Sequence, residues 1–389
     1  MISKTAMKLS AITAAAVLTL TACGTATPAA TSSLPTELGE SEGTVSLLAW
    51  PGYVEDGSND PAYDWVSDFE KSTGCQVTSK SYGTSDEAIS LFKSGDYDVI
   101  AASGDATLRL IASGEVAELN TDLIPSYKDV YPFLKAQKWN SVDGKVYGVP
   151  HGYGANLLMY NTKVVKPAPT SWDVVFDKGS AYKGKVTAYD SPIYIADAAL
   201  YLMKHNPELA ITNPYALDET QLTAAVDLLK AQRANIGEYW SDYLKSIQSF
   251  ETGDTVVGTT WQVIKNSMSE KATVEAILPS EGATGWSDNW MISSKAKSPN
   301  CAYKWLDYID SAKANAAATS YFGEAPATAG ACDIEGMAET CASYHAGDEA
   351  YAAQIWYWTT PVAACVDGRT DVECTDYGRW TQAWQEIKG

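Results

Sequence analysis

The sequence predicts an α/β protein made of two lobes, each organised around a mostly parallel β-sheet. Two stretches alternate strand-like and helix-like patterns, residues 44–103 and residues 185–278, and such alternation is typical of a parallel sheet covered by helices. About 345 residues follow the first 43, which is enough chain for two lobes that each bury a core.

The first stretch contains three strand patterns separated by two helix patterns. Ligands on parallel sheets bind at the carboxyl ends of the strands, so we expect functional residues at positions 50–53 and 103–105. The predicted elements are Thr44–Trp50, Ala62–Ser72, Gln76–Tyr82, Ser85–Ser94 and Asp98–Ser103.

A second series follows a glycine-rich interruption. Residues 146–160 predict two strands broken by Pro150-His151-Gly152-Tyr153-Gly154. We interpret the break as a crossover between the lobes, because glycine tolerates the backbone angles that a hinge needs. The later elements are strands at Lys185–Asp190, Val256–Trp261 and Thr273–Leu278, and helices at Ile195–Lys204, Gln221–Gln232 and Cys301–Ile309.

Residues 1–22 are typical of a secretory signal peptide. Two lysines precede an apolar run, Ala11 to Leu20, that is too short to span a bilayer as a mature helix. The following Thr21-Ala22-Cys23 resembles the lipobox of bacterial lipoproteins, in which the cysteine is acylated and becomes the new N-terminus. We therefore expect an exported protein, on the outer face of the cytoplasmic membrane or in the periplasm, anchored through Cys23. The alternative is an ordinary secretory signal with a chance cysteine.

The segment 23–43 is rich in Thr, Ala, Ser and Pro, which predicts a flexible tether. Removing residues 1–22 takes away two lysines and no acids, so the net charge changes from −20 to −22. Such an anionic surface argues against nucleic acid as a partner. No later apolar run approaches about 18 residues, so the lipid is the only membrane contact that we expect.

We expect both lobes to be discontinuous in the sequence. The first lobe is predicted to comprise residues 44–153 and 289–330, and the second lobe residues 154–288 and 331–389.

Six cysteines lie beyond Cys23, and an even number in an exported protein predicts disulfides. Six cysteines allow fifteen pairings. The simplest pairing joins two local pairs, each with eight residues between its members, and leaves the last two to pair across most of the chain. Without a Cys-x-x-Cys spacing, and with only three histidines, we expect no metal site and no cofactor. The two expected local disulfides are Cys332 with Cys341 and Cys365 with Cys374, and the expected long-range disulfide is Cys75 with Cys301.

Aromatic and acidic residues recur at the predicted strand ends. Ring quadrupoles and ionised carboxylates both attract ammonium groups, so the combination predicts a site for an organic cation. Each residue also has a structural explanation: a tryptophan can pack in the core, Asp105 can cap a helix, and Asp190 can form a turn. Their common position on one predicted edge favours the site. The candidates are Trp50, Tyr53, Asp105, Tyr153, Asp190, Trp261, Trp286 and Asp288.

Catalytic motifs are absent from the sequence. It contains no Gly-x-Ser-x-Gly, no His-Glu-x-x-His and no glycine-rich phosphate loop. Asp190 and Asp288 could in principle act as a glycosidase pair, but nothing local marks either as an acid. We therefore expect a binding protein and not an enzyme.

Short motifs in a fixed order carry a family resemblance over nearly all of the mature chain. They are Ala49-Trp50-Pro51-Gly52-Tyr53, Asp96-Tyr97-Asp98-Val99-Ile100, Tyr147-Gly148-Val149-Pro150, Tyr160-Asn161-Thr162, Tyr182-Lys183-Gly184-Lys185-Val186, and Glu281-Gly282 followed by Trp286 and Asp288. The series resembles the spermidine/putrescine-binding family of extracellular solute-binding proteins. The resemblance implies the type II periplasmic-binding-protein fold, with two α/β lobes joined by a hinge and a ligand cleft between them. It also implies a monomer that works with an ABC permease in the cytoplasmic membrane.

Family members hold ligand amines with carboxylates and place the methylene chain between aromatic rings. The resemblance therefore implies ligand contacts from both lobes and from the return crossover. They are Trp50, Tyr53 and Ser103, then Asp190 and Trp261, then Trp286 and Asp288.

Three departures from the family pattern indicate a rearranged charge distribution. Ile193 stands where polyamine binders have a glutamate, Asp105 stands where they have an aromatic residue, and the run Tyr321-Phe322-Gly323-Glu324 lies close to the place of a tyrosine. Glu324 is therefore a further expected ligand contact. The run of residues 189–197 and the six cysteines resemble a branch that includes 4-aminobutyrate binders. Such a zwitterion needs a donor for its carboxylate, with Lys265, Arg233 or a helix start as candidates.

The function that we expect is capture of a small organic amine, such as putrescine, spermidine or 4-aminobutyrate, for import by an ABC transporter. A sugar-binding receptor is the first alternative, because tryptophan-lined clefts also stack on sugar rings. An exported hydrolase and an envelope scaffold without a ligand are further alternatives.

Overall fold

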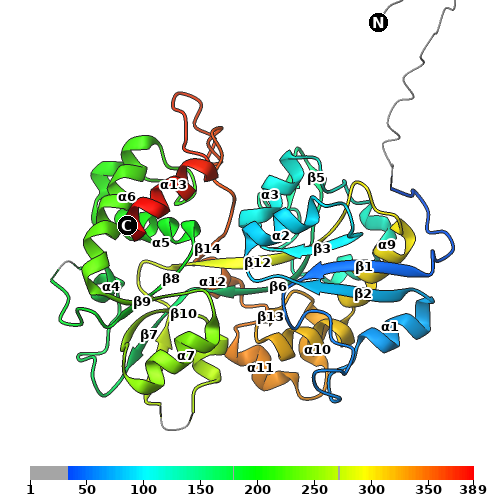
Figure 1. Ribbon diagram of the computed structural model, residues 1–389, viewed down its shortest axis with the longest axis horizontal. Helices are drawn as coiled ribbons and strands as arrows, with labels where there is room; N and C mark the ends of the chain where they lie inside the picture. The colour runs from blue at the N-terminus through cyan, green and yellow to red at the C-terminus, as the bar shows by residue number, and fades with distance from the viewer. Residues whose placement is uncertain (1–33, 178, 270–271) are drawn as a thin grey trace, which may run out of the picture. The chain divides into compact units, whose positions relative to one another are not determined.

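The computed structural model describes residues 34–177, 179–269 and 272–389 (Figure 1). The predicted signal peptide, the lipidation site Cys23 and most of the predicted tether lie outside these residues. The described end of the tether contacts the folded protein, because the Glu42 carboxylate accepts hydrogen bonds from the backbone N–H groups of Asn300 and Cys301 at 2.9 and 2.8 Å. Within the described residues, no helix combines the length and the hydropathy that a membrane crossing requires.

A seven-stranded sheet forms the first lobe, in the order β13-β6-β12-β3-β1-β2, with β14 paired to β12. Its N-terminal strands β1, β2 and β3 are parallel and confirm the first predicted series. The strands are β1 (Thr44–Ala49), β2 (Gln76–Ser81), β3 (Val99–Ala102), β6 (Val149–Ala155), β12 (Ala283–Ile292), β13 (Ala325–Pro326) and β14 (Ile355–Tyr357). The helices of this region are α1 (Val66–Thr73), α2 (Ser85–Phe92), α3 (Gly104–Ala112), α9 (Pro299–Ile309), α10 (Ala312–Phe322), α11 (Met337–Ser343) and α12 (Glu349–Ala352).

A five-stranded sheet forms the second lobe, in the order β11-β7-β10-β8-β9 (Figure 1). Strand β8 is parallel to both β10 and β9, whereas β7 is antiparallel to β10 and β11. The strands are β7 (Leu157–Asn161), β8 (Val186–Tyr189), β9 (Ile236–Trp240), β10 (Val257–Thr260) and β11 (Val274–Ile277). The helices are α4 (Asp173–Phe176), α5 (Ile195–His205), α6 (Glu219–Gln232), α7 (Tyr243–Thr252), α8 (Gln262–Asn266) and α13 (Tyr377–Lys388), and a small hairpin of β4 (Ser141–Val142) and β5 (Lys145–Val146) lies apart from both sheets.

Strand β12 has no counterpart in the sequence analysis. All ten of its residues are buried, the polar ones included, so its sequence shows no alternation of polar and apolar side chains. It pairs with β6 and β3 as an antiparallel strand and with β14 as a parallel one. The predicted site residues Trp286 and Asp288 therefore lie in the middle of a sheet.

The predicted break at residues 150–154 is wrong, because these residues lie inside β6. The two sheets are instead separated at Asn156, between β6 and β7. Glycine is needed at two of these positions for close packing: a Cβ on Gly152 would stand 2.2 Å from the Glu324 side chain, and one on Gly154 would stand 2.4 Å from the Trp286 ring. The two strands and the crossover between the sheets are therefore present as predicted, but the crossover lies at Asn156 and not at the glycines.

Three disulfides form the simplest pairing that the sequence allowed. They join Cys75 to Cys301, Cys332 to Cys341, and Cys365 to Cys374. The first disulfide joins Cys75, directly before β2, to Cys301 in α9, and these two cysteines are 226 residues apart in sequence. The last closes the segment that returns the chain from β14 to α13.

Candidate ligand-binding cleft

Strand ends from both sheets meet at one partly open space of about 280 Å³, which we call the inner chamber. The carboxyl ends of β1, β2 and β3 contribute to it from one lobe, and those of β8, β9 and β10 from the other, as expected for parallel sheets. The residues that line it are Trp50, Pro51, Tyr82, Gly83, Ser103, Tyr189, Ser241, Asp242, Tyr243, Trp261, Trp286, Asp288, Phe322 and Trp358.

Aromatic rings make up most of the chamber wall. Four of them contact one another in a closed circuit, which we call the aromatic box. A second contact, between Trp50 and Tyr82 with ring centroids 4.4 Å apart, lies on the side of the first lobe. Such a wall attracts a cation or stacks on an apolar chain. The members of the box are Tyr189, Trp261, Trp286 and Trp358.

Asp288 supplies the buried charge of the inner chamber. It lies two residues after Trp286 on β12, so both side chains point to the same face of the sheet. Its carboxylate accepts a 2.8 Å hydrogen bond from the Tyr53 hydroxyl and a second from the Ser103 hydroxyl. Burial raises the pKa of Asp288 to about 6, against the opposing effect of these two donors. The group is therefore ionised at neutral pH.

A second buried acid, Glu324, lies behind the chamber wall. The Trp286 indole donates a long 3.4 Å hydrogen bond to one carboxylate oxygen, and His151 Nε2 lies 3.9 Å from the other. Burial lowers the pKa of His151 to about 3, so this ring brings no positive charge. Burial and the charge of Asp288 raise the pKa of Glu324 well above its usual value. We therefore treat Glu324 as a neutral acid that supports Trp286.

Asn156, at the crossover between the sheets, fixes one wall of the box. Its side-chain oxygen accepts a 2.9 Å hydrogen bond from the Trp261 indole, and its amide donates a 2.7 Å hydrogen bond to Thr284 Oγ1. Asn156 is buried, so both contacts are shielded from water. The residue that separates the two sheets thus also orients a ring of the site.

Positive side chains are absent from the described lining of the inner chamber. The proposed carboxylate donors Lys265 and Arg233 lie on α8 and on the 3-10 turn after α6, and neither lines the chamber. Two helix starts at the cleft already carry carboxylates of their own. Asp105 lies in the first turn of α3, and Asp242 caps α7 by accepting a 2.9 Å hydrogen bond from the Leu244 N–H.

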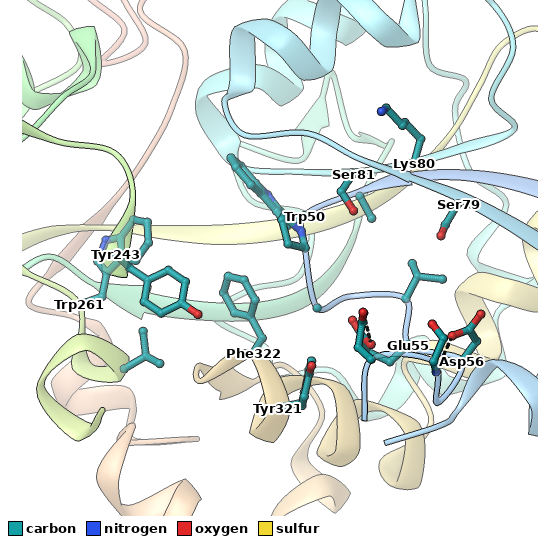
Figure 2. Close-up of a pocket in the computed structure, with 17 residues that line it drawn as sticks. Trp50, Glu55, Asp56, Ser79, Lys80, Ser81, Tyr243, Trp261, Tyr321 and Phe322 are labelled. Carbon is teal, nitrogen blue, oxygen red and sulfur yellow. Dashed lines mark hydrogen bonds between the residues drawn. The ribbon is translucent and has the colours of Figure 1, made fainter. Parts of the chain in front are cut away.

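A larger outer chamber of about 520 Å³ adjoins the inner one (Figure 2). The two share Trp50, Pro51, Tyr243, Trp261 and Phe322. Figure 2 shows Tyr243, Trp261 and Phe322 at one end of the outer chamber and Glu55 with Asp56 at the other. Its remaining lining mixes polar residues, Ser58, Asn59, Ser79, Lys80 and Ser81, with Ala49, Gly52, Val54, Val263 and Tyr321.

Five of the ten predicted site residues line the inner chamber, namely Trp50, Ser103, Trp261, Trp286 and Asp288. The other five have different surroundings. Tyr53 is fully buried and contacts Asp288 from behind, as Glu324 contacts Trp286. Tyr153 accepts a 2.8 Å hydrogen bond from the Gly347 N–H in a space of about 20 Å³ outside the cleft.

Asp105 and Asp190 line a separate space of about 100 Å³. Asp190 pairs with Lys388 at 2.5 Å and accepts a 3.2 Å hydrogen bond from the Trp384 indole, so its charge is already compensated by α13. Asp105 is buried and has a pKa raised to about 6 by that burial.

Several chamber residues escaped the sequence analysis. Tyr82 and Tyr189 stand at predicted strand ends, so the rule that selected Trp50 could have found them. Trp358 and Phe322 follow elements that the sequence pattern did not place at the cleft. The Trp358 backbone packs closely against Gly104, because a Cβ at Gly104 would stand 1.9 Å from the Trp358 carbonyl oxygen.

One group outside the cleft has side chains of the type that bind metal ions, Asp173, His205 and Glu281. Its members already have protein partners. His205 Nε2 lies 2.8 Å from Glu281 Oε1, and Tyr201 and Ser171 donate hydrogen bonds to Asp173 and Glu281 respectively. This network accounts for the cluster without an ion.

Comparison with known proteins places residues 64–344 within a family profile described as bacterial extracellular solute-binding protein. The spermidine/putrescine-binding periplasmic protein 1 of Haemophilus influenzae is 27% identical over 272 residues, which cover 68% of this chain and 70% of that protein. Two solved structures share the fold. The TpPotD lipoprotein of Treponema pallidum has a TM-score of 0.71 at 17% identity, covering 88% of this chain and 99% of its own. A GABA (4-aminobutyrate) receptor has a TM-score of 0.63 at 18% identity, covering 88% and 95%.

Proposed function

Because the chain belongs to the bacterial extracellular solute-binding protein family, we propose that it captures a small organic amine that carries no carboxylate and presents it to an ABC permease. The family assignment and the type II fold confirm the resemblance that the ordered motifs predicted. We infer the chemical class of the ligand from the residues that line the inner chamber.

The observation that carries the proposal is a buried, ionised carboxylate among aromatic rings. Asp288 is 2% exposed, and no described lysine or arginine lines the chamber with it. A buried charge without a counter-ion costs several kcal/mol, so a cationic ligand would relieve that cost on binding. The curated relatives named for spermidine, putrescine and cadaverine support the same ligand class.

A zwitterion such as 4-aminobutyrate fits this chamber less well, although one structural neighbour is a GABA receptor. Its carboxylate would need a donor, and no described lysine or arginine lines the chamber. The donors that remain there are neutral, among them the buried indole N–H groups of Trp50 and Trp358, which have no hydrogen-bond partner among the described residues. Asp105 and Asp242 lie at the starts of α3 and α7 and would repel a second anion there, whereas α8, which starts directly after Trp261, has no acid in its first turn. We therefore favour a simple cation over a zwitterion.

Export, anchoring through Cys23, action as a monomer and the absence of catalysis belong to the same proposal. The lipobox motif and the family support export to the outer face of the membrane. The predicted lobe boundaries, at residues 153–154, 288–289 and 330–331, also belong to the proposal, except that β12 and β14 pair in the seven-stranded sheet and we assign them to the first lobe.

Calorimetric titration and thermal shift with matched ligands test the proposal. We expect putrescine, spermidine and butylamine to bind, and 4-aminobutyrate and maltose to bind at least about tenfold more weakly. A ligand at one hundred times its Kd adds about 2.7 kcal/mol to the free energy of unfolding, which a thermal scan detects. Binding of 4-aminobutyrate alone would favour the zwitterion, and binding of maltose alone would favour the sugar receptor. Either result would contradict the cation site.

A further inference from the structure

The aromatic box is closed on itself. Ring centroids are 5.6 Å apart from Tyr189 to Trp261, 5.1 Å from Trp261 to Trp286, 6.2 Å from Trp286 to Trp358, and 5.7 Å from Trp358 back to Tyr189. All four rings line the inner chamber. A cation attracted by ring faces is stabilised when it lies within about 6 Å of the ring centroids. The spacing of the box allows several rings to act on one small cation.

Hydrogen-bond acceptors are scarce in the same space. A primary ammonium brings three N–H donors, and each needs an acceptor once it leaves water. Asp288 is the buried carboxylate of the chamber, and each of its oxygens already accepts one hydrogen bond, from Tyr53 and from Ser103. About two of its four acceptor positions remain, which is fewer than the three N–H donors of a primary ammonium. Asp242, the other carboxylate in the lining, is exposed and caps α7. The indole groups of Trp261 and Trp286 are donors, and both are bonded elsewhere.

The outer chamber has the opposite character. Its far end presents the carboxylates of Glu55 and Asp56 (Figure 2). Its lining also includes Asn59, Lys80 and serine hydroxyl groups. Groups with many N–H or O–H donors are therefore better satisfied there than inside the box. A ligand that suits both chambers would therefore have a head with few N–H donors in the inner chamber and a polar remainder in the outer chamber.

On these grounds we propose that the inner chamber selects an N-methylated ammonium head, tertiary or quaternary, over a primary ammonium on the same skeleton. The inference rests on the proposed function, because it assumes that the ligand is an organic cation held beside Asp288. Methyl groups replace N–H donors that the chamber cannot satisfy, and they contact ring faces that it provides in excess.

The test is a titration with two matched pairs of ligands on the purified protein. The first pair is 1,4-diaminobutane and its N,N,N-trimethyl derivative, and the second pair is ethanolamine and choline. We expect the methylated member of each pair to bind at least about fivefold more tightly. A smaller ratio, or a preference for the primary amine, overturns the inference while leaving the proposed function intact. If neither member of either pair binds, the proposed function fails and the inference fails with it.

Variants of Trp358 show whether the box causes the preference. Trp358→Leu retains apolar volume but removes one ring face, so the affinity ratio should fall to about twofold or less. Trp358→Phe retains a ring face and should preserve the ratio. An unchanged ratio in Trp358→Leu assigns the preference to something other than the box and overturns the inference. Asp288→Asn is the matched control, because loss of the charge should weaken both members of a pair alike. Should the leucine variant not fold, the ratio in the unaltered protein decides the question alone.

Discussion

The two chambers of the cleft use different chemistry although they share five residues. The inner chamber combines buried rings with one buried carboxylate, whereas the outer chamber presents exposed polar groups around Asp56, Lys80 and two serines. Charges in a buried site act at low effective dielectric, and exposed charges are screened by water. From this comparison we expect the binding energy to be concentrated in the inner chamber and the polar end of the proposed ligand to lie in the outer chamber.

Removal of the Asp288 charge should have the largest effect on ligand affinity. Removing one partner of a buried charge pair costs about 2–5 kcal/mol, so Asp288→Asn should weaken binding of a cationic amine by about thirtyfold or more. Calorimetric titration measures the change. The unliganded variant should unfold at the same temperature as the unaltered protein or a higher one, because a buried charge has been removed. Unchanged affinity would exclude Asp288 as the ligand's counter-ion.

Displacement of the Trp286 ring should have the second largest effect on ligand affinity. A Cβ on Gly154 would stand 2.4 Å from the Trp286 indole, so Gly154→Ala should push that ring from its place and weaken binding about tenfold. Trp286→Leu should produce a similar loss. Gly378→Ala, on the exterior helix α13, is the matched control and should leave affinity unchanged. Equal affinity in all three variants would remove Trp286 from the site.

Protonation of Asp288 should weaken binding about tenfold between pH 7.5 and pH 5. The pKa of this carboxyl is about 6 and its cation-binding form is the ionised one, so affinity should fall as the pH falls through 6. The groups that face it are Tyr53, Ser103, Asp105 and Glu324. In Asp288→Asn this pH dependence should disappear, and its persistence there would point to a different titrating group.

The unliganded protein should respond to pH in the opposite direction. Burial raises the folded-state pKa of Asp288 and Asp105 to about 6 and that of Asp197 to about 8. A raised pKa favours the protonated folded form, so this contribution to stability is complete below the unfolded pKa and is lost as the pH rises through about 6 to 8. The melting temperature without ligand should therefore be higher at pH 5 than at pH 8, whereas the ligand-induced shift should be smaller.

Removing the hydrogen bond that orients the Trp261 indole should weaken ligand binding moderately. Asn156→Ala removes the acceptor of the Trp261 indole hydrogen bond, so we expect a loss of about threefold to fivefold in affinity, in line with about 1 kcal/mol for a hydrogen bond. The variant also leaves Thr284 without its amide partner, so the melting temperature must be followed in parallel. A loss of stability with no change in affinity would restrict Asn156 to a structural role.

Changes in the outer chamber should have the smallest effect. Asp56 is exposed, so Asp56→Asn should change affinity less than about twofold and should slow association mainly at low ionic strength. Stopped-flow measurements at two salt concentrations test this. A large effect on dissociation would show that binding energy is shared between the chambers, against the contrast drawn above.

The strands of the first predicted series and the two lobes were predictable because their signals are local. Thr44–Ala49 and Val99–Ala102 are apolar runs, and the α/β order restricts how such runs can pair. The rule that ligands meet the carboxyl ends of parallel strands then selected Trp50, Ser103 and Trp261. The disulfides also followed from spacing, because two pairs close short loops and leave one pair over.

Other features depended on contacts between distant segments, and no local pattern reports those. Strand β12 is buried on both faces, so its polarity does not alternate, and the glycines of β6 that looked like a hinge admit the side chains of Glu324 and Trp286. Asp190 and Asp288 were both predicted at strand ends, but only Asp190 follows a strand, β8, whereas Asp288 lies inside β12. Lys388, 198 residues away, pairs with Asp190, while Ser103, 185 residues from Asp288, holds Asp288 in the chamber. The sequence by itself determined the fold class and indicated the edge of the sheets where we propose that a ligand binds. Only the tertiary structure decided which acid remains without a cationic partner, because that depends on which distant side chains fold against it.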